Sequence, residues 1–446
     1  MEKARQLLKK YTPEMIKTIQ ETVRFNTIKK EAVGIYPYGK DTAECLDYVL
    51  NKCQELGLSI YNCDYHAGHA DFGEGDTILG ILGHLDVVPV SENGWKYPPF
   101  SGTVAEGKIW GRGALDDKAP MISCLYAIKA LKESGFKPSK KIRLIFGCDE
   151  EDGMTCISYY KTKVKMPDLA FTPDGDFPCL NGEKGLFGVT IDFGKLPTEV
   201  LELTAGDRIN VVPDCCTALI SSVVDTKDIL NCGLEISKTD SGTLIKGTGL
   251  SVHGSLPETG INATWKVCKA LHTLFPYNET LKFVNDKMTY DTDGHAWGFP
   301  FKDEQSGKIT ISMDVLRIVN GNLYAGIDIR FPVTFTCDQI EQAIYKNSLH
   351  NIKIIDAHKA NPLYVEKDSF LVKTLLNAFN EVTGKNEDAH VIGGGTYAKS
   401  MPNCIAAGPE FEGDENLIHQ TNEYISLDRL EQMTNIYLKA IYDLSK

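Results

Sequence analysis

The order of the apolar segments in the first half of the sequence is the feature that most restricts the fold of this chain. Short apolar runs at residues 77–82, 141–146 and 168–171 have the length of buried strands. Between the first two, apolar residues recur at helical spacing over residues 121–131. Strand, helix and strand in this order are typical of a crossover between parallel strands. The sequence therefore predicts an α/β fold, with a mixed, mostly parallel sheet flanked by helices.

Local signals predict where two helices begin before the first of these strands. Thr12 and Pro13 form a threonine cap followed by proline at the first helical position. Asp41 and Glu44 resemble a capping box and predict the start of a second helix, which Gly57 would end. Both helices would supply part of the helical layer that such a sheet needs.

The middle of the chain has a different pattern. Segments 309–319 and 322–331 alternate apolar and polar residues and are joined by an Asn-Gly pair, which favours a two-residue hairpin turn. Such antiparallel pairing is typical of a separate α+β domain. We therefore predict an α/β domain formed by residues 1–184 and 360–446, interrupted by an inserted α+β lid domain of residues 185–359.

Charge and composition restrict the partners and the compartment. The chain of 446 residues has 60 acidic and 47 basic side chains, a formal net charge of −13. This surplus argues against a nucleic acid or an anionic membrane as a partner, because both need clustered Lys and Arg. No segment approaches the roughly 20 apolar residues of a membrane span, and the first residues lack the pattern of a secretory signal. The 13 cysteines include no C-x-x-C pair, so we expect reduced thiols and a cytoplasmic protein.

Histidine and acidic residues follow the predicted strands and precede the predicted helix. These residues are His84, Asp86, Asp116, Glu150, Glu151 and Asp174. Taken alone, each has an ordinary explanation as a packed histidine, a helix cap or a solvated turn. In an α/β sheet, however, ligands collect at the carboxyl ends of the strands. Clustered carboxylates repel unless cations lie between them, and imidazole with carboxylate suits zinc or manganese better than calcium.

Such a ligand set is suited to amide hydrolysis. Two metal ions about 3.5–4 Å apart could share a bridging carboxylate and a bridging water. The pKa of that water falls toward about 7, and a nearby carboxylate can accept its proton. The sequence therefore predicts a divalent metal site with hydrolytic chemistry.

Several motifs resemble a known family. Residues 84–89 (HLDVVP), 111–118 (GRGALDDK) and 150–153 (EEDG) resemble the di-metal aminoacylase/carboxypeptidase-G-type metallopeptidases. Residues 171–174 (FTPD) and 393–398 (GGGTYA) resemble the bacterial dipeptidase V-like branch, which is similar to Xaa-His dipeptidases and carnosinases. The resemblance implies a sheet of the zinc-peptidase type and a peptidase activity.

The same resemblance implies two divalent metal ions held by five residues. Asp116 would bridge the two ions. His84 and Asp174 would complete one site, and Glu151 and His419 would complete the other. Zinc is the expected metal, and manganese or cobalt would suit the same ligands.

Catalytic roles are also implied by the resemblance. Glu150 would be the general base that takes a proton from water and returns it to the leaving amine. Asp86 would hydrogen-bond the far nitrogen of His84 and fix its tautomer. The peptide bond between Asp116 and Asp117 is expected to be cis.

The inserted domain carries further matches to the family. His253 and Asn210 would reach over the substrate, with the imidazole of His253 donating to the tetrahedral oxyanion. Arg330 would meet a free substrate carboxylate, for which a guanidinium fork is well suited. Gly394 and Gly395 would form a backbone wall against the substrate.

Together, these residues predict a metal-dependent dipeptidase that hydrolyses short peptides with free amino and carboxyl ends through a metal-bridging water. The alternative is an N-acyl-amino-acid deacylase with the same di-metal site. A metal or peptide carrier is disfavoured, because a carrier gains nothing from the extra base Glu150. The long insertion could cover the site within one chain, which favours a monomer over a dimer.

Overall fold

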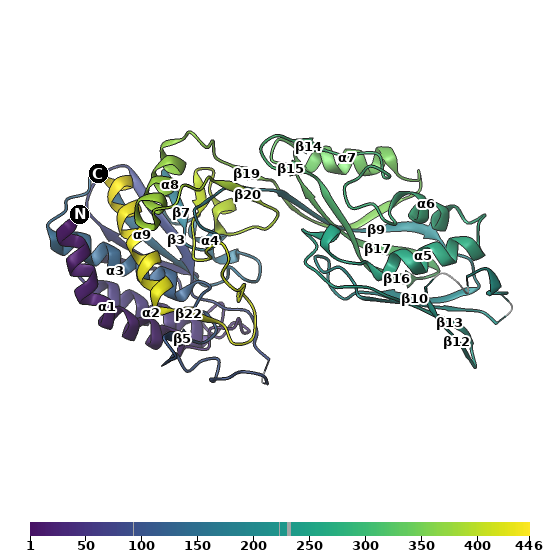
Figure 1. Cartoon of the computed structure of the whole chain (residues 1–446), viewed down its shortest axis with the longest axis horizontal. Helices are drawn as coiled ribbons and strands as arrows, with labels where there is room; N and C mark the ends of the chain where they lie inside the picture. The colour runs from purple at the N-terminus through teal and green to yellow at the C-terminus, as the bar shows by residue number, and fades with distance from the viewer. Residues whose placement is uncertain (92, 223, 230–232) are drawn as a thin grey trace. The chain divides into compact units, whose positions relative to one another are not determined.

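The computed structural model describes residues 1–91, 93–222, 224–229 and 233–446, and it divides into two compact units (Figure 1). The first unit consists of Met1–Asn181, Val365–His390 and Gly395–Lys446, and the second of Gly182–Tyr364 and Val391–Gly394. The predicted boundaries after residues 184 and 359 differ from this division by a few residues. The sequence analysis did not assign the short segment Val391–Gly394 to the second unit.

The first unit is built on a mixed sheet. Six of its strands lie in the order β1 (Ser59–Cys63), β2 (Ala67–Phe72), β6 (Lys141–Gly147), β3 (Ile78–His84), β7 (Leu169–Thr172) and β21 (Cys404–Ala406). Strands β6, β3, β7 and β21 run parallel to one another, whereas β2 pairs antiparallel with both β1 and β6. The predicted mixed sheet is confirmed, and its parallel strands lie next to one another in the series.

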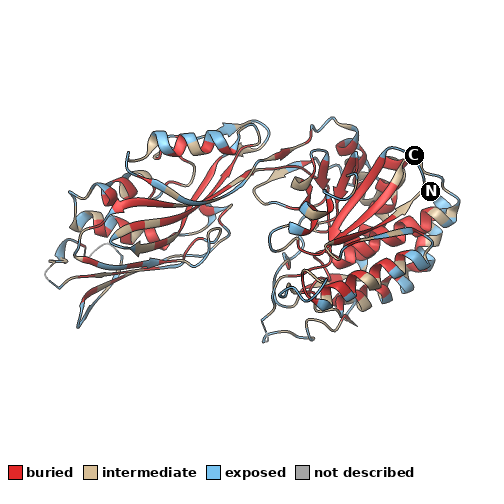
Figure 2. Ribbon diagram, turned by 180° about the vertical axis from the view of Figure 1, so that it is seen from behind, coloured by how far each residue is buried: buried red, intermediate tan, exposed pale blue. Residues whose placement is uncertain are grey.

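Helices flank this sheet (Figure 1). Helix α3 (Lys118–Ser134) packs against α1 (Glu2–Val23), α9 (Leu427–Ser445) and strands β3 and β6. Every residue of α3 from Lys118 to Leu131 is buried (Figure 2). A helix that is covered on all sides needs mostly apolar residues, and the buried polar side chains of α3 have partners: Lys118, Ser123 and Lys129 donate to Phe25, Ala119 and Glu14. None of the described helices is long and apolar enough to cross a membrane.

The predicted start of the first helix is wrong. Helix α1 begins at Glu2 and continues through Pro13. Leu8 precedes the proline, Met15 follows it, and both side chains are buried on the same helix. Proline removes one backbone hydrogen bond. Packing on both sides of Pro13 outweighs that loss, and a local capping signal does not include packing.

The predicted capping box is also wrong, although the helix itself exists. Helix α2 (Lys40–Glu55) begins after Gly39, which supplies no side-chain cap. The carboxylate of Asp41 instead forms an ion pair with Lys30. Beyond the end of α2, Gly57 has a φ of +77°, the left-handed conformation that glycine adopts readily at such ends.

The second unit has an eight-stranded antiparallel sheet. Its order is β12 (Glu235–Thr239), β13 (Gly242–Thr248), β11 (Cys215–Ile220), β10 (Val200–Ala205), β16 (Thr310–Val319), β17 (Asn322–Phe331), β9 (Gly185–Lys195) and β18 (Lys353–Ala360). Among the described residues of this unit, three α-helices accompany the sheet: α5 (Ala263–Leu274), α6 (Glu279–Lys287) and α7 (Cys337–Asn347). The predicted hairpin is present, since Asn320 and Gly321 both have positive φ between β16 and β17.

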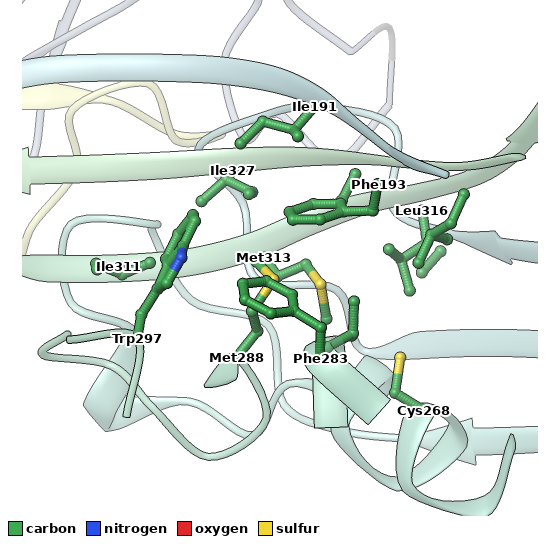
Figure 3. Close-up of a cluster of buried hydrophobic side chains, with 14 of the residues drawn as sticks. Ile191, Phe193, Cys268, Phe283, Met288, Trp297, Ile311, Met313, Leu316 and Ile327 are labelled. Atoms are coloured by element: carbon green, nitrogen blue, oxygen red, sulfur yellow. The ribbon is translucent and has the colours of Figure 1, made fainter. Parts of the chain in front are cut away.

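The core of the second unit follows from the alternation of side chains along its strands. Phe187, Val189, Ile191 and Phe193 occupy alternate positions of β9, and all four are fully buried. They pack with side chains from β16, β17, α5 and α6, as the labelled residues of Figure 3 show. The intervening positions of β9 and β17 therefore face the other side of the sheet, where polar residues lie.

Candidate metal centre

Four segments of the first unit bring the predicted ligands to one edge of its sheet. Strand β3 ends at His84, which pairs in register with Gly147, the last residue of β6. The loop after β6 carries Glu151, and the loop after β7 carries Asp174. Because these strands are parallel, their carboxyl ends lie at the same edge. Asp116 lies immediately before α3, close to the same edge.

A small three-stranded sheet brings His419 to this edge. Strand β5 (Lys108–Trp110) pairs with β4 (Thr103–Ala105) on one side and with β22 (Tyr424–Ser426) on the other. The segment that precedes Asp116 and the segment that follows His419 therefore lie side by side. Residues about 300 positions apart in the sequence can then meet.

Asp116 is the centre of the cluster. One carboxylate oxygen lies 3.0 Å from Nε2 of His84, and the other lies 3.1 Å from Nε2 of His419. The same nitrogen of His419 lies 3.0 Å from Oε2 of Glu151, and Nε2 of His84 lies 3.9 Å from Oδ2 of Asp174. The structure thus brings together all five predicted metal ligands.

The donor atoms are close enough to share cations. In two groups, His84 with Asp116 and Glu151, and His84 with Glu150 and Asp174, one donor atom per residue lies within 4.8 Å of the others. Imidazole nitrogen and carboxylate oxygen are ligands for zinc, manganese and related divalent ions. The residues present therefore fit divalent metal ions.

The protonation of this cluster follows from its mixture of charges. Burial alone would lower the pKa of His84, but its hydrogen bond with Asp116 and the surrounding carboxylates raise that pKa well above its usual range. Burial likewise opposes the rise at His419, yet Asp116 and Glu151 raise its pKa to about 10. Burial would raise the pKa of Asp116, but hydrogen bonds from both histidines hold it below its usual range. Positive charge between these carboxylates is therefore strongly favoured.

Residues 80–443 match the model of a family described as Peptidase family M20/M25/M40. The chain belongs to this peptidase family. Over 97% of both chains, it is 34% identical to the Bacillus subtilis protein named "Putative dipeptidase YtjP". It is also 34% identical to a Staphylococcus epidermidis protein named "Putative dipeptidase", again over 97% of both chains.

Solved structures show that the fold of this peptidase is shared. Human carnosine dipeptidase 1 matches with a TM-score of 0.60 at 14% identity, covering 99% of this chain and 98% of that one. The dipeptidase Dug1p of Saccharomyces cerevisiae matches with a TM-score of 0.59 at 14% identity, with the same coverage. At these identities the similarity concerns the fold.

Asp86 contacts His84 in this peptidase, but not with the group that was predicted. Nδ1 of His84 lies 2.9 Å from the backbone carbonyl oxygen of Asp86 and 3.6 Å from its carboxylate. The two carboxylate oxygens instead accept the backbone N–H groups of Glu150 (3.1 Å) and Glu151 (3.0 Å). Asp86 therefore orients a histidine and an acidic loop at the same time.

Glu150 lies beside the cluster formed by the predicted ligands. Burial raises its pKa well above its usual range, and the charges of Asp174, Glu151 and Asp86 raise it further. The charge of His84 opposes this rise. Glu150 is thus a carboxyl group with a high affinity for a proton, next to the edge where a metal would be held.

A buried ion pair that sequence reasoning missed connects two of the ligand segments. Glu423 is fully buried and accepts the backbone N–H groups of Leu115 (2.8 Å) and Asp116 (3.3 Å). Arg112 donates to Glu423 at 2.5 Å and to the backbone carbonyl oxygen of His419 at 3.0 Å. The available signal was that Arg112 lies in the same motif as Asp116, residues 111–118, and that Glu423 follows His419 by four residues.

The backbone before α3 has the predicted conformation. The peptide bond between Asp116 and Asp117 is cis. The carboxylate of Asp117 accepts the backbone N–H of His84 at 3.2 Å. A Cβ atom on Gly83 would lie only 2.1 Å from that carboxylate, so glycine is required for this approach.

Three further predicted site residues lie together in the second unit. The backbone carbonyl of Asn210 accepts the N–H of Gly254, the neighbour of His253, at 2.7 Å. Burial lowers the pKa of His253, and the nearby charge of Arg330 lowers it further. Arg330 binds the carboxylate of Asp328 and the carbonyl oxygen of Gly393. The structure therefore assembles Asn210, His253 and Arg330 within one unit.

The predicted glycines lie where the chain leaves the second unit. Gly394 ends the short segment assigned to that unit, and Gly395 belongs to the first. The preceding Gly393 contributes its carbonyl oxygen to Arg330 at 2.9 Å. Tyr397 follows in the same motif, and its hydroxyl would lie 2.0 Å from a Cβ on Gly147 at the end of β6. This glycine-rich segment therefore has structural contacts of its own, and its role as a wall against the substrate stays a prediction.

Proposed function

We propose that this peptidase hydrolyses dipeptides with a free amine and a free carboxylate, using two divalent metal ions. The observation that carries the proposal is the Asp116 carboxylate, because each oxygen faces a different histidine, His84 or His419. A carboxylate placed in this way is suited to lie between two cations. Dipeptidase is also the activity in the names of the two bacterial relatives.

The proposed ligands fit zinc best, with manganese or cobalt as alternatives. Asp116 would be shared, His84 and Asp174 would hold one ion, and Glu151 and His419 would hold the other. When bound, such ions lower the pKa of water and polarise a peptide carbonyl.

Glu150 is the proposed general base and acid. It accepts a proton from the attacking water and donates it to the nitrogen of the leaving amino acid. Its position beside His84 and Asp174 supports this role, because a carboxylate at that place can take a proton from a water held between the ligands. Asp86 supports the same loop through the backbone N–H of Glu150.

The second unit supplies the proposed contacts to the substrate ends. The imidazole of His253 donates to the oxyanion that develops during attack, and Asn210 assists it. Arg330 binds the free carboxylate of the dipeptide, since a guanidinium matches two carboxylate oxygens. Gly394 and Gly395 leave room for the substrate backbone.

We also propose that one chain is sufficient for activity and that the protein works in the cytoplasm. The length of the second unit supports a monomer, because an insertion of this size could cover the site within one chain. None of the described cysteines is in a disulfide, which agrees with a reducing compartment.

A substrate panel with metal analysis tests the proposed function. The purified chain is assayed with dipeptides, with tripeptides and with N-acetyl amino acids, before and after chelation. We expect two equivalents of divalent metal and hydrolysis of dipeptides that chelation abolishes. Activity confined to N-acetyl amino acids would instead indicate a deacylase. Undiminished activity without metal would overturn the proposal.

A further inference from the structure

One face of the sheet in the second unit carries a buried ion pair. Asp328 and Arg330 are two residues apart on β17, so their side chains lie on the same face. This is the face opposite to the apolar core, which contains Ile327 and Ile329. Asp328 is fully buried, and the side chain of Arg330 is 8% exposed. The sequence analysis identified Arg330 but not its partner, although spacing of two along a strand was a usable signal.

The contacts of Arg330 leave a defined part of its guanidinium available. Nε and Nη2 donate to the carboxylate of Asp328 at 2.8 and 3.0 Å. Nη1 donates to the carbonyl oxygen of Gly393 at 2.9 Å. A guanidinium has five N–H donors. Within the described part of the chain, one N–H on each of the two terminal nitrogens therefore has no protein acceptor, which is the number that a carboxylate can bind.

Arg330 borders a cavity. Arg330, Asp328 and Asn210 line it together with Thr190 and His358, and its volume is about 230 Å³. The cavity lies within the second unit, on the polar face of the sheet. A ligand that entered it would meet a guanidinium whose orientation is already set by Asp328.

The same carboxylate also restricts the turn that carries His253. A Cβ atom on Gly254 would lie 2.6 Å from Oδ2 of Asp328, so the turn packs closely on this carboxylate. The N–H of Gly254 donates to the carbonyl oxygen of Asn210 at 2.7 Å. Asn210 has a φ of +112°, an uncommon conformation that persists only where its surroundings hold it. Asp328 thus touches both the arginine and the turn.

We propose that Asp328 is a positioning residue that aims Arg330 at the carboxylate of the substrate. It occupies Nε and one N–H of Nη2, which leaves the end of the guanidinium for the ligand. This inference rests on the proposed function, in which Arg330 binds that carboxylate. Asp328 acts through Arg330 and does not itself contact the substrate.

The test compares each dipeptide with its C-terminal amide. The ratio of kcat/KM for the free acid to kcat/KM for the amide measures recognition of the carboxylate. We expect Asp328→Asn to lower this ratio by about tenfold, mainly through a higher KM for the acid. Without the charge of Asp328, Arg330 is no longer oriented and loses its charge-assisted bidentate contact with the substrate carboxylate. The value for the amide should change less than about twofold.

Asp192→Asn is the matched control. Asp192 is another buried carboxylate of this sheet, on β9, and it accepts hydrogen bonds from Gly194 (2.9 Å) and Asn322 (2.9 Å). The substitution is chemically identical but involves no contact with Arg330. The acid-to-amide ratio should therefore match that of the wild-type chain.

Two further variants separate the inference from the function on which it rests. Arg330→Ala should lower the ratio at least as much as Asp328→Asn. An unchanged ratio in Asp328→Asn with a lowered ratio in Arg330→Ala overturns the positioning role alone. An unchanged ratio in Arg330→Ala overturns the proposed role of the arginine.

If Asp328→Asn does not fold, Asp328→Glu keeps the charge and shifts the carboxylate by one methylene. A ratio equal to wild type in that variant would equally refute positioning.

Discussion

The two clusters of buried charge in this peptidase are balanced in opposite ways. In the first unit, the carboxylates of the candidate metal centre outnumber the two histidines that face them. In the second unit, the carboxylate of Asp328 is matched by the guanidinium of Arg330. The carboxylates of the first cluster therefore need positive charge from solution. In the second cluster, the negative charge of Asp328 is already balanced by Arg330. Metal should affect the first unit and leave the second almost unchanged.

The largest expected effect is the loss of the proposed proton carrier. Glu150→Gln removes the carboxylate but keeps the size of the side chain. We expect kcat to fall by about 10²–10⁴-fold, the usual scale of general acid–base catalysis. Metal content should remain at the wild-type value, because Glu150 is not one of the five proposed ligands. Steady-state kinetics and elemental analysis of the same preparation measure both quantities.

Glu151→Gln, one residue along the chain, is the matched comparison. Glu151 lies 3.0 Å from His419 and is a proposed ligand, so this variant should lose metal as well as activity. Equal metal loss in both variants would contradict the division of roles between the two glutamates. Turnover in Glu150→Gln within twofold of wild type would exclude it as the base.

Removal of metal should destabilise the first unit specifically. A ligand at 100 times its Kd stabilises the folded state by about 2.7 kcal/mol. We therefore expect chelation to lower the Tm, and hydrogen exchange to accelerate around His84 and Glu151. Exchange across β16 and β17 of the second unit should not change. His84→Ala, which removes a proposed ligand, should abolish the response. If chelation accelerated hydrogen exchange equally in both units, the claim that metal acts on the first unit alone would be contradicted.

The Arg112–Glu423 pair should tune metal affinity without contacting metal. Glu423→Gln keeps an acceptor for the N–H of Asp116 but loses the charge that holds Arg112. Residues that orient metal ligands typically contribute about 10–100-fold in affinity. We expect a weakening of this size in competition with a chelating dye. Glu14→Gln, which removes an acid–lysine pair at Lys129 elsewhere in the first unit, is the control and should leave the affinity unchanged.

The sequence was most informative about site residues that lie at the ends of strands. The ends of β3, β6 and β7 could be located from apolar runs, and parallel pairing then requires His84, Glu151 and Asp174 to share an edge. The hairpin at Asn320 could be predicted because its backbone conformation is restricted locally. Strand ends and hairpin turns could be predicted because they depend on residues that are close together in the sequence.

Features that depend on distant contacts could not be predicted in this way. Pro13 remains inside α1 because of packing partners far along the chain. The carboxylate of Asp86 binds two backbone N–H groups of a loop more than 60 residues away, so its carbonyl oxygen contacts His84 instead. The pairing of Glu423 with Arg112 likewise requires the small sheet of β4, β5 and β22. These contacts follow from tertiary structure, which local patterns do not record.

The smallest expected effect concerns Asp314, a further buried carboxylate of the sheet in the second unit. Burial raises its pKa to about 7. Its hydrogen bonds with Ser312 and the backbone N–H of Asn210 lower that pKa, as does the charge of Arg330, whereas the charge of Asp328 raises it. The native state therefore holds a proton on Asp314 at pH values where the unfolded chain has released it.

This proton makes the stability of the second unit depend on pH. Because the native pKa lies above the unfolded value of 3.8, the free energy of unfolding should fall as the pH rises from about 4 to about 7 and then level off. Asp314→Asn removes the titrating group, so its stability should fall less over this range. Denaturant unfolding of the wild-type protein and of Asp314→Asn at several pH values gives the slope of the free energy of unfolding against pH for each. Above about pH 8 the two slopes should agree. Identical slopes between pH 4 and 7 would show that Asp314 is ionised throughout, and that its charge, like that of Asp328, is balanced in the folded chain.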